Sequence, residues 1–359
     1  MVPEASYKKI ARFIKEEILE GKYVPGDRIP SENKLATLFG VSRMTARKAI
    51  DNLVYDGIVI RIPGLGTYVA EGAKHIDNKR FHVGILMDDL SDTRGISISS
   101  GITRTLLELS VHPIMTEVSS YELSSIEKEI KLLITYGADG IILTPKVDLS
   151  NSKFFMRLVD EGFPIVFIDR GIDGIPIPVV ESANYQGGKC LGKHLKEIHD
   201  SKKVLFVSEE GLIISSVRER YEGLKDGLGE EVDFLEISDS KSSFEDITKK
   251  IIEKSYDVVA FCHDLLAVSG MSYFLKNDIK IPKDIKITGF DDRRVSQYFI
   301  PNITTVRQDF NKMGSTAALF LVKLLKGEKV PQREKIPIKL IVRESCGCKG
   351  KAPHKYGRP

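Results

Sequence analysis

The start of the chain alternates apolar and polar positions with the spacing of short amphipathic helices. Over residues 7–20 the apolar side chains recur every three or four positions, as on one face of a helix. Similar runs cover 32–39 and 42–57, and a glycine marks the end of each run. Ser31 and Ser42 begin the later two runs, where a hydroxyl can accept hydrogen bonds from free backbone amides. The pattern predicts three helices, the last two of them capped.

The next segment changes to a period of two. Residues 58–70, IVIRIPGLGTYVA, alternate in polarity on both sides of the turn sequence PGLG at 63–66. This pattern predicts a two-stranded hairpin. Three helices followed by a hairpin within about 70 residues form the outline of a winged helix-turn-helix domain.

The expected third helix has separate apolar and basic faces. Its core side is formed by Ala46, Ala49, Ile50, Leu53 and Val54. Arg43 and Arg47 are four residues apart and lie together on the other side, beside Thr45 and Lys48. The basic half is N-terminal, which is the half that a recognition helix presents to base edges. From the two arginines alone, a solvent-exposed basic helix of a protein-binding module would explain the pattern as well.

Beyond a polar stretch at 71–80, which we interpret as a linker, short apolar runs alternate with amphipathic stretches. The runs are HVGILM, ADGIILT, PIVFID, KVLFVS, DVVAFC and DIKITGF. Buried strands that alternate with helices predict parallel sheets of βαβ units. Residues 81–345 hold too many units for one small sheet, so we expect an α/β domain of two lobes with a cleft between them. Residues 346–359 are expected to form an extended tail.

Composition and charge limit the possible function. The 359 residues, 42% hydrophobic and 29% charged, are typical of a soluble globular protein of two or three domains. No apolar run approaches the roughly 18 residues of a membrane span, and the charged N-terminus is unlike a signal peptide. We therefore expect a cytoplasmic protein without a membrane partner. The net charge of +3 arises in residues 1–70, which hold 11 Lys or Arg and 8 Asp or Glu.

The sequence shows neither a metal motif nor a catalytic motif. Cys346 and Cys348 lack the spacing of C-x-x-C sites, and four cysteines in this arrangement are no disulfide framework. His194 and His199 are five residues apart on a helix-like stretch, a poor metal geometry, and we expect them at the surface. G-x-S-x-G, P-loop and H-E-x-x-H patterns are absent. We expect no metal, no cofactor and no enzymatic activity.

The first region resembles a known family. Residues 27–70, DRIPSENKLATLFGVSRMTARKAIDNLVYDGIVIRIPGLGTYVA, are similar to the winged helix of the GntR family of bacterial transcription regulators. The matching positions are Pro25, Gly26, Pro30, Ser31, Glu32, Val41, Ser42, Arg43, Thr45, Arg47, Gly57, Gly64 and Gly66. The resemblance implies that double-stranded operator DNA is bound by Asn33, Ser42, Arg43, Thr45, Arg47, Lys48 and the wing residues Gly64 and Gly66.

The chemistry of these residues suits DNA. Arginine offers paired donors to guanine O6 and N7, so the resemblance places Arg43, Thr45 and Arg47 on bases or adjacent phosphates. Ser42 and the backbone amides at the helix start suit a phosphate. Asn33 stands where family members often carry arginine, and it can still form hydrogen bonds with DNA. Winged helices of this kind bind near-palindromic sites in pairs, which implies a homodimer.

Residues 81–345 resemble the effector domain of the LacI/GalR repressors, which is similar to periplasmic sugar-binding proteins. The matches are Gly84, Ile85, Asp169, Arg170, Asn184, Gly187, Gly188, Arg220, Gly223, Asp264 and the segments TGFDD and ITTVRQDF. The resemblance implies a small sugar in the cleft, bound by Asp88, Asp169, Arg170, Arg220, His263 and Asp291. His263 replaces the usual asparagine, which implies a different ligand or pose. Asp264 is expected to cap the next helix, and Thr93 and Arg94 are further cleft candidates.

A GntR-type reader joined to a LacI-type sensor is the architecture of the arabinose repressors. This resemblance implies a repressor that L-arabinose releases from its operator. Another pentose, a hexose, a sugar phosphate or a nucleoside are alternative effectors, and some LacI-type proteins need their ligand as a corepressor. A sugar-binding receptor and a sugar-acting enzyme remain as other classes.

Overall fold

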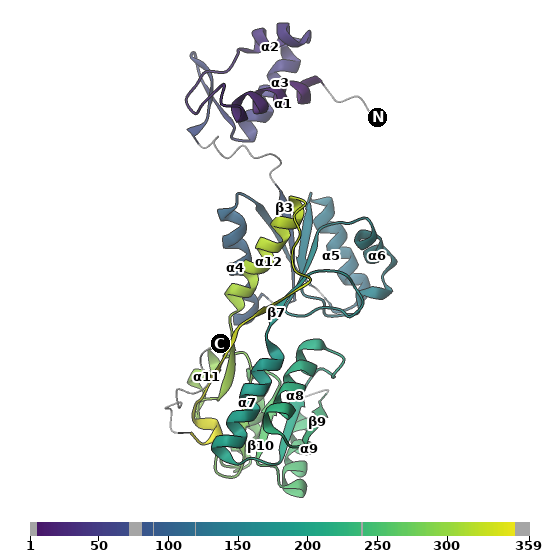
Figure 1. Ribbon diagram of the computed structural model, residues 1–359, viewed down its shortest axis with the longest axis vertical. Coiled ribbons are helices and arrows are strands. Elements are labelled where there is room, and N and C mark those ends of the chain that lie inside the picture. The colour runs from purple at the N-terminus through teal and green to yellow at the C-terminus, as the bar shows by residue number, and fades with distance from the viewer. Residues whose placement is uncertain (1–5, 72–80, 89, 119, 238–239, 349–359) are drawn as a thin grey trace. The chain divides into compact units, whose positions relative to one another are not determined.

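The computed structural model describes residues 6–71, 81–88, 90–118, 120–237 and 240–348. The chain divides into two compact units, residues 1–79 and 80–359, and each is described by itself (Figure 1). Apart from residue 71, the expected linker lies outside the described residues, as does the chain after 348. None of the helices in the described ranges has the length and apolar character needed to span a bilayer.

The first unit is a winged helix, as expected. It contains α1 (Ser6–Leu19), α2 (Glu32–Phe39), α3 (Arg43–Tyr55) and the antiparallel strands β1 (Val59–Ile62) and β2 (Gly66–Val69). The side chains of Ser31 and Ser42 accept hydrogen bonds from the backbone amides of Lys34 and Thr45, which confirms both caps. The core is formed by apolar side chains of the three helices and the wing, among them Ile10, Ile14, Leu35, Ala46, Ala49 and Leu53.

The second unit has two lobes, and the first contains a six-stranded parallel sheet of order β13-β7-β6-β5-β3-β4. Its strands are β3 (His82–Met87), β4 (His112–Glu117), β5 (Gly140–Leu143), β6 (Ile165–Ile168), β7 (Val179–Ser182) and β13 (Arg333–Ile336). Helices α4 (Thr93–Glu108) and α12 (Phe310–Leu325) cover one face. Helices α5 (Leu123–Thr135) and α6 (Lys153–Asp160) cover the other (Figure 1). The short helix η2 (Leu149–Asn151) precedes α6.

The second lobe contains a four-stranded parallel sheet of order β11-β10-β8-β9. Its strands are β8 (Val204–Ser208), β9 (Val232–Glu236), β10 (Val258–Phe261) and β11 (Lys286–Thr288). Its helices are α7 (Asn184–His199), α8 (Ser215–Leu228), α9 (Ser240–Lys254), α10 (Asp264–Lys276) and α11 (Val295–Tyr298). An antiparallel pair, β12 (Thr305–Gln308) with β14 (Ile338–Ile341), and η3 (Glu344–Cys346) complete it. The chain passes between the lobes after β7, β12 and β13, so the predicted two-lobed α/β domain is confirmed.

Glycines allow α7 and α8 to pack closely. A Cβ atom on Gly223 would lie 2.0 Å from the carbonyl oxygen of Tyr185, and one on Gly188 would lie 2.2 Å from that of Arg220. Real side chains do not approach a backbone oxygen so closely, so only glycine fits at these two crossings. The contact also sets the distance between Asn184, at the start of α7, and Arg220 on α8.

Replacing Gly223 with alanine is expected to lower the free energy of unfolding by about 1–3 kcal/mol or more, because the added methyl group must push the helices apart. Urea unfolding of the two proteins measures this difference. Glu222→Ala, at the exposed neighbouring position of α8, is the matched control and should change stability little. Equal stability of Gly223→Ala and the parent protein would show that the α7–α8 contact is loose.

Candidate functional site

A cavity of about 160 Å³ lies between the lobes of the second unit. Its lining residues are Arg94, Lys146, Asp169, Arg170, Glu209, Glu210, Ser216, Val217, Arg220, Cys262, His263, Asp291 and Arg293. Most follow the carboxyl ends of strands, where open α/β sheets bind ligands. The cavity is smaller than the roughly 300–1,000 Å³ of pockets for drug-sized ligands. Its size and polar walls fit a small, hydrophilic molecule.

Asp169 is the carboxylate of the first lobe in this cavity. It follows β6 with a φ of 73°, a left-handed conformation that aspartate tolerates better than most residues. Arg94 Nη1 lies 3.3 Å from Asp169 Oδ2 and Arg170 Nε lies 3.5 Å from it. Burial opposes the charged form, but the surrounding guanidinium groups outweigh it and lower the pKa of Asp169 to about 2. Asp169 is therefore a permanently charged hydrogen-bond acceptor.

Arg220 is held on several sides by the second lobe. Its Nε donates to Asn184 Oδ1 at 2.9 Å and its Nη1 donates to the carbonyl oxygen of Cys262 at 2.7 Å. The guanidinium carbon lies 4.1 Å from the ring centre of Phe290, and Nη1 lies 3.6 Å from Asp291 Oδ1. These contacts fix a planar donor group in the cavity wall before any ligand arrives.

Asp291 follows β11 with a φ of 110°. Its carboxylate accepts hydrogen bonds from Arg293 Nε at 2.9 Å and from Gln308 Nε2 at 2.5 Å. Arg293 also forms an ion pair with Asp92, at the start of α4 in the first lobe. Strained backbone at a strand end is a common mark of functional sites, and here the strained residue lies beside an interlobe ion pair.

The structure places Asp88 behind the cavity wall. Asp88 is buried and is not a lining residue; it forms ion pairs with Arg94 and with Lys146 Nζ, the latter at 3.1 Å. Burial opposes ionisation, but these two cations lower the pKa of Asp88. Arg94, the second candidate at this corner, is the residue that lines the cavity, and Asp88 orients it.

Arg170 and Glu210 connect the two lobes across the cavity. Arg170 Nη1 lies 2.9 Å from Glu210 Oε1, and Lys146 Nζ lies 3.7 Å from the same oxygen. Arg170 follows β6 in the first lobe, whereas Glu210 follows β8 in the second. Ion pairs of this kind must rearrange when the lobes move relative to each other, so they are sensitive to a ligand bound between them.

His263, not Asp264, caps helix α10, so the expected cap was wrong. His263 Nδ1 accepts a hydrogen bond from the Leu266 amide at 3.2 Å, and its Nε2 lies 3.2 Å from Glu209 Oε2. Because Nδ1 accepts, Nε2 carries the proton and donates to Glu209. Asp264 is the first residue of α10, fully buried, and it accepts hydrogen bonds from the Arg293 amide and two hydroxyl groups.

The residues expected to contact DNA line two hollows of the first unit. One is lined by Asn33, Arg43, Gly64 and Gly66 together with Arg28 and Arg61, among others. The other is lined by Thr45, Arg47 and Lys48 with Tyr7, Met44 and Asp51. Arg43, Arg47 and Lys48 are exposed on α3. Ser42, at the N-terminus of α3, is the cap described above.

Glu32 aligns two arginines at the first of these hollows. Arg43 Nε lies 3.1 Å from Glu32 Oε2, and Arg61 Nη2 lies 3.3 Å from Glu32 Oε1. Gly66 has a φ of 132°, and a Cβ atom there would lie 2.6 Å from Arg28 Nε. The wing therefore closes against Arg28, and Arg28 and Arg61 add two cations that the motif analysis missed.

Comparison with known proteins assigns both units. Residues 6–69 match the model of the bacterial regulatory proteins of the gntR family, and residues 216–346 match that of the periplasmic binding protein-like domain. The chain joins a GntR helix-turn-helix domain to a periplasmic-binding-protein-like domain. This result confirms the resemblances on which the expected fold and DNA-binding surface rest.

Two curated relatives match nearly the whole chain. The arabinose metabolism transcriptional repressor of Halalkalibacterium halodurans is 24% identical over 91% of this chain and 91% of its own length. The repressor of the same name from Geobacillus stearothermophilus is 23% identical over 94% of this chain and 97% of its own length. Among solved structures, a periplasmic binding protein/LacI transcriptional regulator of Alkaliphilus metalliredigens complexed with D-xylulofuranose has a TM-score of 0.61 at 22% identity. The match covers 74% of the present chain and 98% of the solved chain.

Four charged residues of the periplasmic-binding-protein-like domain were missed in the sequence. They are Lys146, Glu209, Glu210 and Arg293. Each lies within a few residues of the end of a parallel strand, as Asp169 and Asp291 do. That position is a usable signal, because the carboxyl ends of parallel strands meet at one edge of the sheet.

Asp264 gives the periplasmic-binding-protein-like domain a pH-dependent stability. Burial and the neighbouring Asp291 raise the pKa of Asp264 to about 7. The folded protein therefore prefers the protonated form of Asp264. The stability that this preference contributes is fully present below the ordinary pKa of 3.8, and it is lost as the pH rises through about 7. Relative to Asp264→Asn, the parent protein is expected to lose stability between about pH 5 and about pH 8. Urea unfolding at both values measures this change, with the exposed Asp246→Asn as control. A constant difference would contradict the raised pKa.

Proposed function

We propose that the chain is a ligand-controlled transcriptional repressor. Its GntR domain binds operator DNA within a homodimer, and a small sugar in the interlobe cavity releases it. The observation that carries this proposal is the combination, in one chain, of an exposed basic helix in a GntR domain and a polar cavity between the lobes of a periplasmic-binding-protein-like domain. The similarity of nearly the full chain to two arabinose metabolism repressors supports it and makes L-arabinose the first candidate.

The cavity suits the recognition of sugar hydroxyl groups. Each hydroxyl can donate one hydrogen bond and accept another, so a good site pairs fixed acceptors with fixed donors. Asp169 and Asp291 supply charged acceptors, and Arg220 supplies charged donors from the opposite lobe to Asp169. Hydrogen bonds to charged partners are about twice as strong as neutral ones. A related fold has been solved with the pentulose D-xylulofuranose, which fits the same size class.

We infer that ligand and operator are linked through the lobes. A sugar that contacts both lobes favours one relative arrangement of them, and it shifts the protein toward that arrangement by its difference in affinity. If the operator favours another arrangement, each ligand weakens the other by the same factor, commonly about 1–3 kcal/mol. The interlobe pairs Arg170–Glu210 and Arg293–Asp92 are the contacts through which this difference acts.

A sugar phosphate is the second candidate effector, because five cations that can donate to phosphate oxygens line the cavity: Arg94, Lys146, Arg170, Arg220 and Arg293. Four carboxylates share the lining, and Asp88 and Asp92 pair with three of the cations, so a phosphate would have to replace a carboxylate as the partner of one of them. A nucleoside fits less well, because the described lining offers no Phe, Tyr or Trp ring on which a base can stack.

Thermal unfolding of the purified full-length protein with a panel of ligands tests the proposal. A ligand that binds only the folded protein raises the melting temperature by mass action. L-Arabinose is expected to raise it, and then to release a labelled operator fragment in fluorescence anisotropy. A shift with another sugar or a sugar phosphate alone would replace the effector. Absence of any shift, together with an operator affinity that no ligand changes, would contradict the sensor role.

A further inference from the structure

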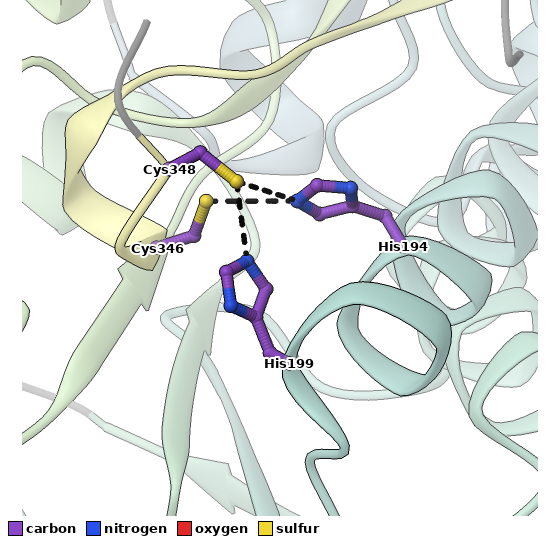
Figure 2. A group of neighbouring side chains, drawn as sticks. All are labelled: His194, His199, Cys346 and Cys348. Atoms are coloured by element: carbon purple, nitrogen blue, oxygen red, sulfur yellow. Dashed lines mark hydrogen bonds between the residues drawn. The ribbon is translucent and has the colours of Figure 1, made fainter. Parts of the chain in front are cut away.

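Two histidines and two cysteines from distant parts of the sequence meet in the second lobe. His194 and His199 lie near the end of α7, and Cys346 and Cys348 lie at the described end of the chain (Figure 2). His194 and Cys346 are completely buried and His199 is partly buried, so the expected surface position of His194 was wrong, and residues 346–348 belong to the second lobe. None of the four lines the interlobe cavity.

The four side chains point toward one centre. Cys346 Sγ lies 3.6 Å from His194 Nε2, and Cys348 Sγ lies 3.9 Å from it. Cys348 Sγ lies 3.4 Å from His199 Nε2, and all four possible ligand atoms lie within 4.8 Å of one another. A tetrahedral zinc ion, with Zn–S of about 2.3 Å and Zn–N of about 2.0–2.1 Å, requires sulfur–nitrogen separations of about 3.5–3.6 Å. The three sulfur–nitrogen distances of 3.4, 3.6 and 3.9 Å lie on both sides of this value.

The backbone around the cysteines is built to present both sulfur atoms. Gly347 has a φ of 98°, a left-handed conformation that suits glycine and turns the chain between the two cysteines. Thr304 Oγ1 donates to Cys346 Sγ at 3.1 Å, and it accepts a hydrogen bond from the Arg343 amide at 2.8 Å. Ser345 Oγ joins the segment to the Ile287 carbonyl oxygen of β11 at 2.7 Å. The cluster is thus held by its surroundings.

The ring of His194 is held so that one nitrogen faces the cysteines. Its ring centre lies 5.1 Å from that of His199, with the two planes at 78°. Within the described part of the chain, His194 Nδ1 has no hydrogen-bond partner, whereas Nε2 faces both sulfur atoms. The cysteines and the ring of His199 therefore orient this imidazole together.

We propose that His194, His199, Cys346 and Cys348 bind one Zn²⁺ ion in a tetrahedral site. Two sulfur and two nitrogen ligands in this geometry select zinc among common metal ions. Four protein ligands leave no open position, so the ion is structural. Binding replaces the two thiol protons, which are released to solvent as the two Zn–S bonds form.

The position of the site gives the ion a mechanical role. It joins the end of α7 to the segment after β14, and this segment lies beside β11 through Thr304 and Ser345. The C-terminal segment is therefore expected to be fastened to the second lobe when zinc is bound, and the lobe should unfold at a lower temperature without it.

Zinc content tests this site directly. Full-length protein purified under reducing conditions and dialysed against zinc is expected to hold one equivalent per chain by elemental analysis. Cys348→Ser and His199→Ala, at the two partly buried positions, should each lose it. Cys190→Ser is the matched control, because it removes a partly buried thiol that lies on α7 outside the cluster. This variant should keep its zinc. Zinc-free parent protein, or full zinc in both ligand variants, would overturn the proposal.

Measurements on the parent protein keep the test independent of the folding of variants. Cobalt(II) in place of zinc is expected to give the intense visible bands of a tetrahedral thiolate site. Removal of the metal by a chelator should make two thiols newly reactive and lower the melting temperature. A cobalt spectrum without thiolate bands, or a mass lower by two hydrogen atoms that reports a Cys346–Cys348 disulfide, would contradict a metal site.

Discussion

Arg220→Ala is expected to move the ligand response to much higher effector concentrations and to leave operator binding intact. Arg220 is the fixed planar donor of the cavity, held by Asn184, the Cys262 carbonyl oxygen and the ring of Phe290. A hydrogen bond to a charged group contributes about 1.5–3 kcal/mol, so its loss should weaken the effector about tenfold to 150-fold. The residues expected to contact the operator lie in the other unit, which the substitution leaves unchanged. Operator release against effector concentration, followed by fluorescence anisotropy, measures both properties on one sample.

The same substitution also removes the cation beside the buried Asp291, and stability must be measured with it. Asp291 keeps its hydrogen bonds from Arg293 and Gln308, so the expected cost is below the roughly 3–5 kcal/mol that follows the loss of a buried charge's partner. Arg220→Lys keeps the charge but loses the planar fork, so it should retain more stability and still respond weakly. Lys225→Ala, which removes an exposed cation of the same helix, is the matched control. Normal release of DNA from folded Arg220→Ala would show that the effector binds elsewhere.

Arg43→Ala and Arg47→Ala are each expected to weaken operator binding by about 1–3 kcal/mol without changing effector affinity. Both side chains are exposed on α3, and each can offer paired donors to guanine or a charge to phosphate. The two kinds of contact differ in their consequences. Loss of a base contact relaxes the preference at one base pair, whereas loss of a phosphate contact weakens all sequences alike and reduces the salt dependence.

Arg12→Ala is the matched control for these two variants. Arg12 lies on α1 near Glu16 and lines a different hollow of the unit from Arg43 and Arg47. It carries the same charge, so a general electrostatic effect would weaken all three variants equally. Binding of Arg43→Ala and Arg47→Ala at the parent affinity would exclude α3 as the recognition helix.

The sequence predicted most of the central strands of the two parallel sheets. β3, β5, β6, β8 and β10 are continuous apolar runs, which is the pattern of such strands, and the edge strand β11 was predicted as well. The central strand β7 was missed, because its sequence VVES is only half apolar. β4, β9 and β13 are edge strands, and their mixed burial leaves no such run. An edge strand is defined by the neighbour with which it pairs, and that neighbour is a property of the tertiary structure.

The candidate sites divide in the same way. The residues expected to contact DNA lie within one short segment, from Asn33 to Gly66. Helix caps, glycines and the helical period act over short distances in the chain, so the sequence alone could place Arg43 and Arg47 on one face. In the cavity, the resemblance to the LacI/GalR effector domain implied Asp169 and Asp291, and both follow strand ends. The sequence could not show that Asp88 stands behind Arg94, because that order depends on the packing of α4 against the sheet.

The two-unit organisation and the capped basic helix α3 could be predicted from the sequence, because each depends on local period or on a contiguous motif. The tertiary structure was needed to show which charged groups face the cavity, that His263 caps α10, and that His194 and His199 meet Cys346 and Cys348. These histidines and cysteines are about 150 residues apart in the chain. No spacing rule reaches that far, because the packing of α7 against β14, the strand that precedes the cysteines, is what brings them together.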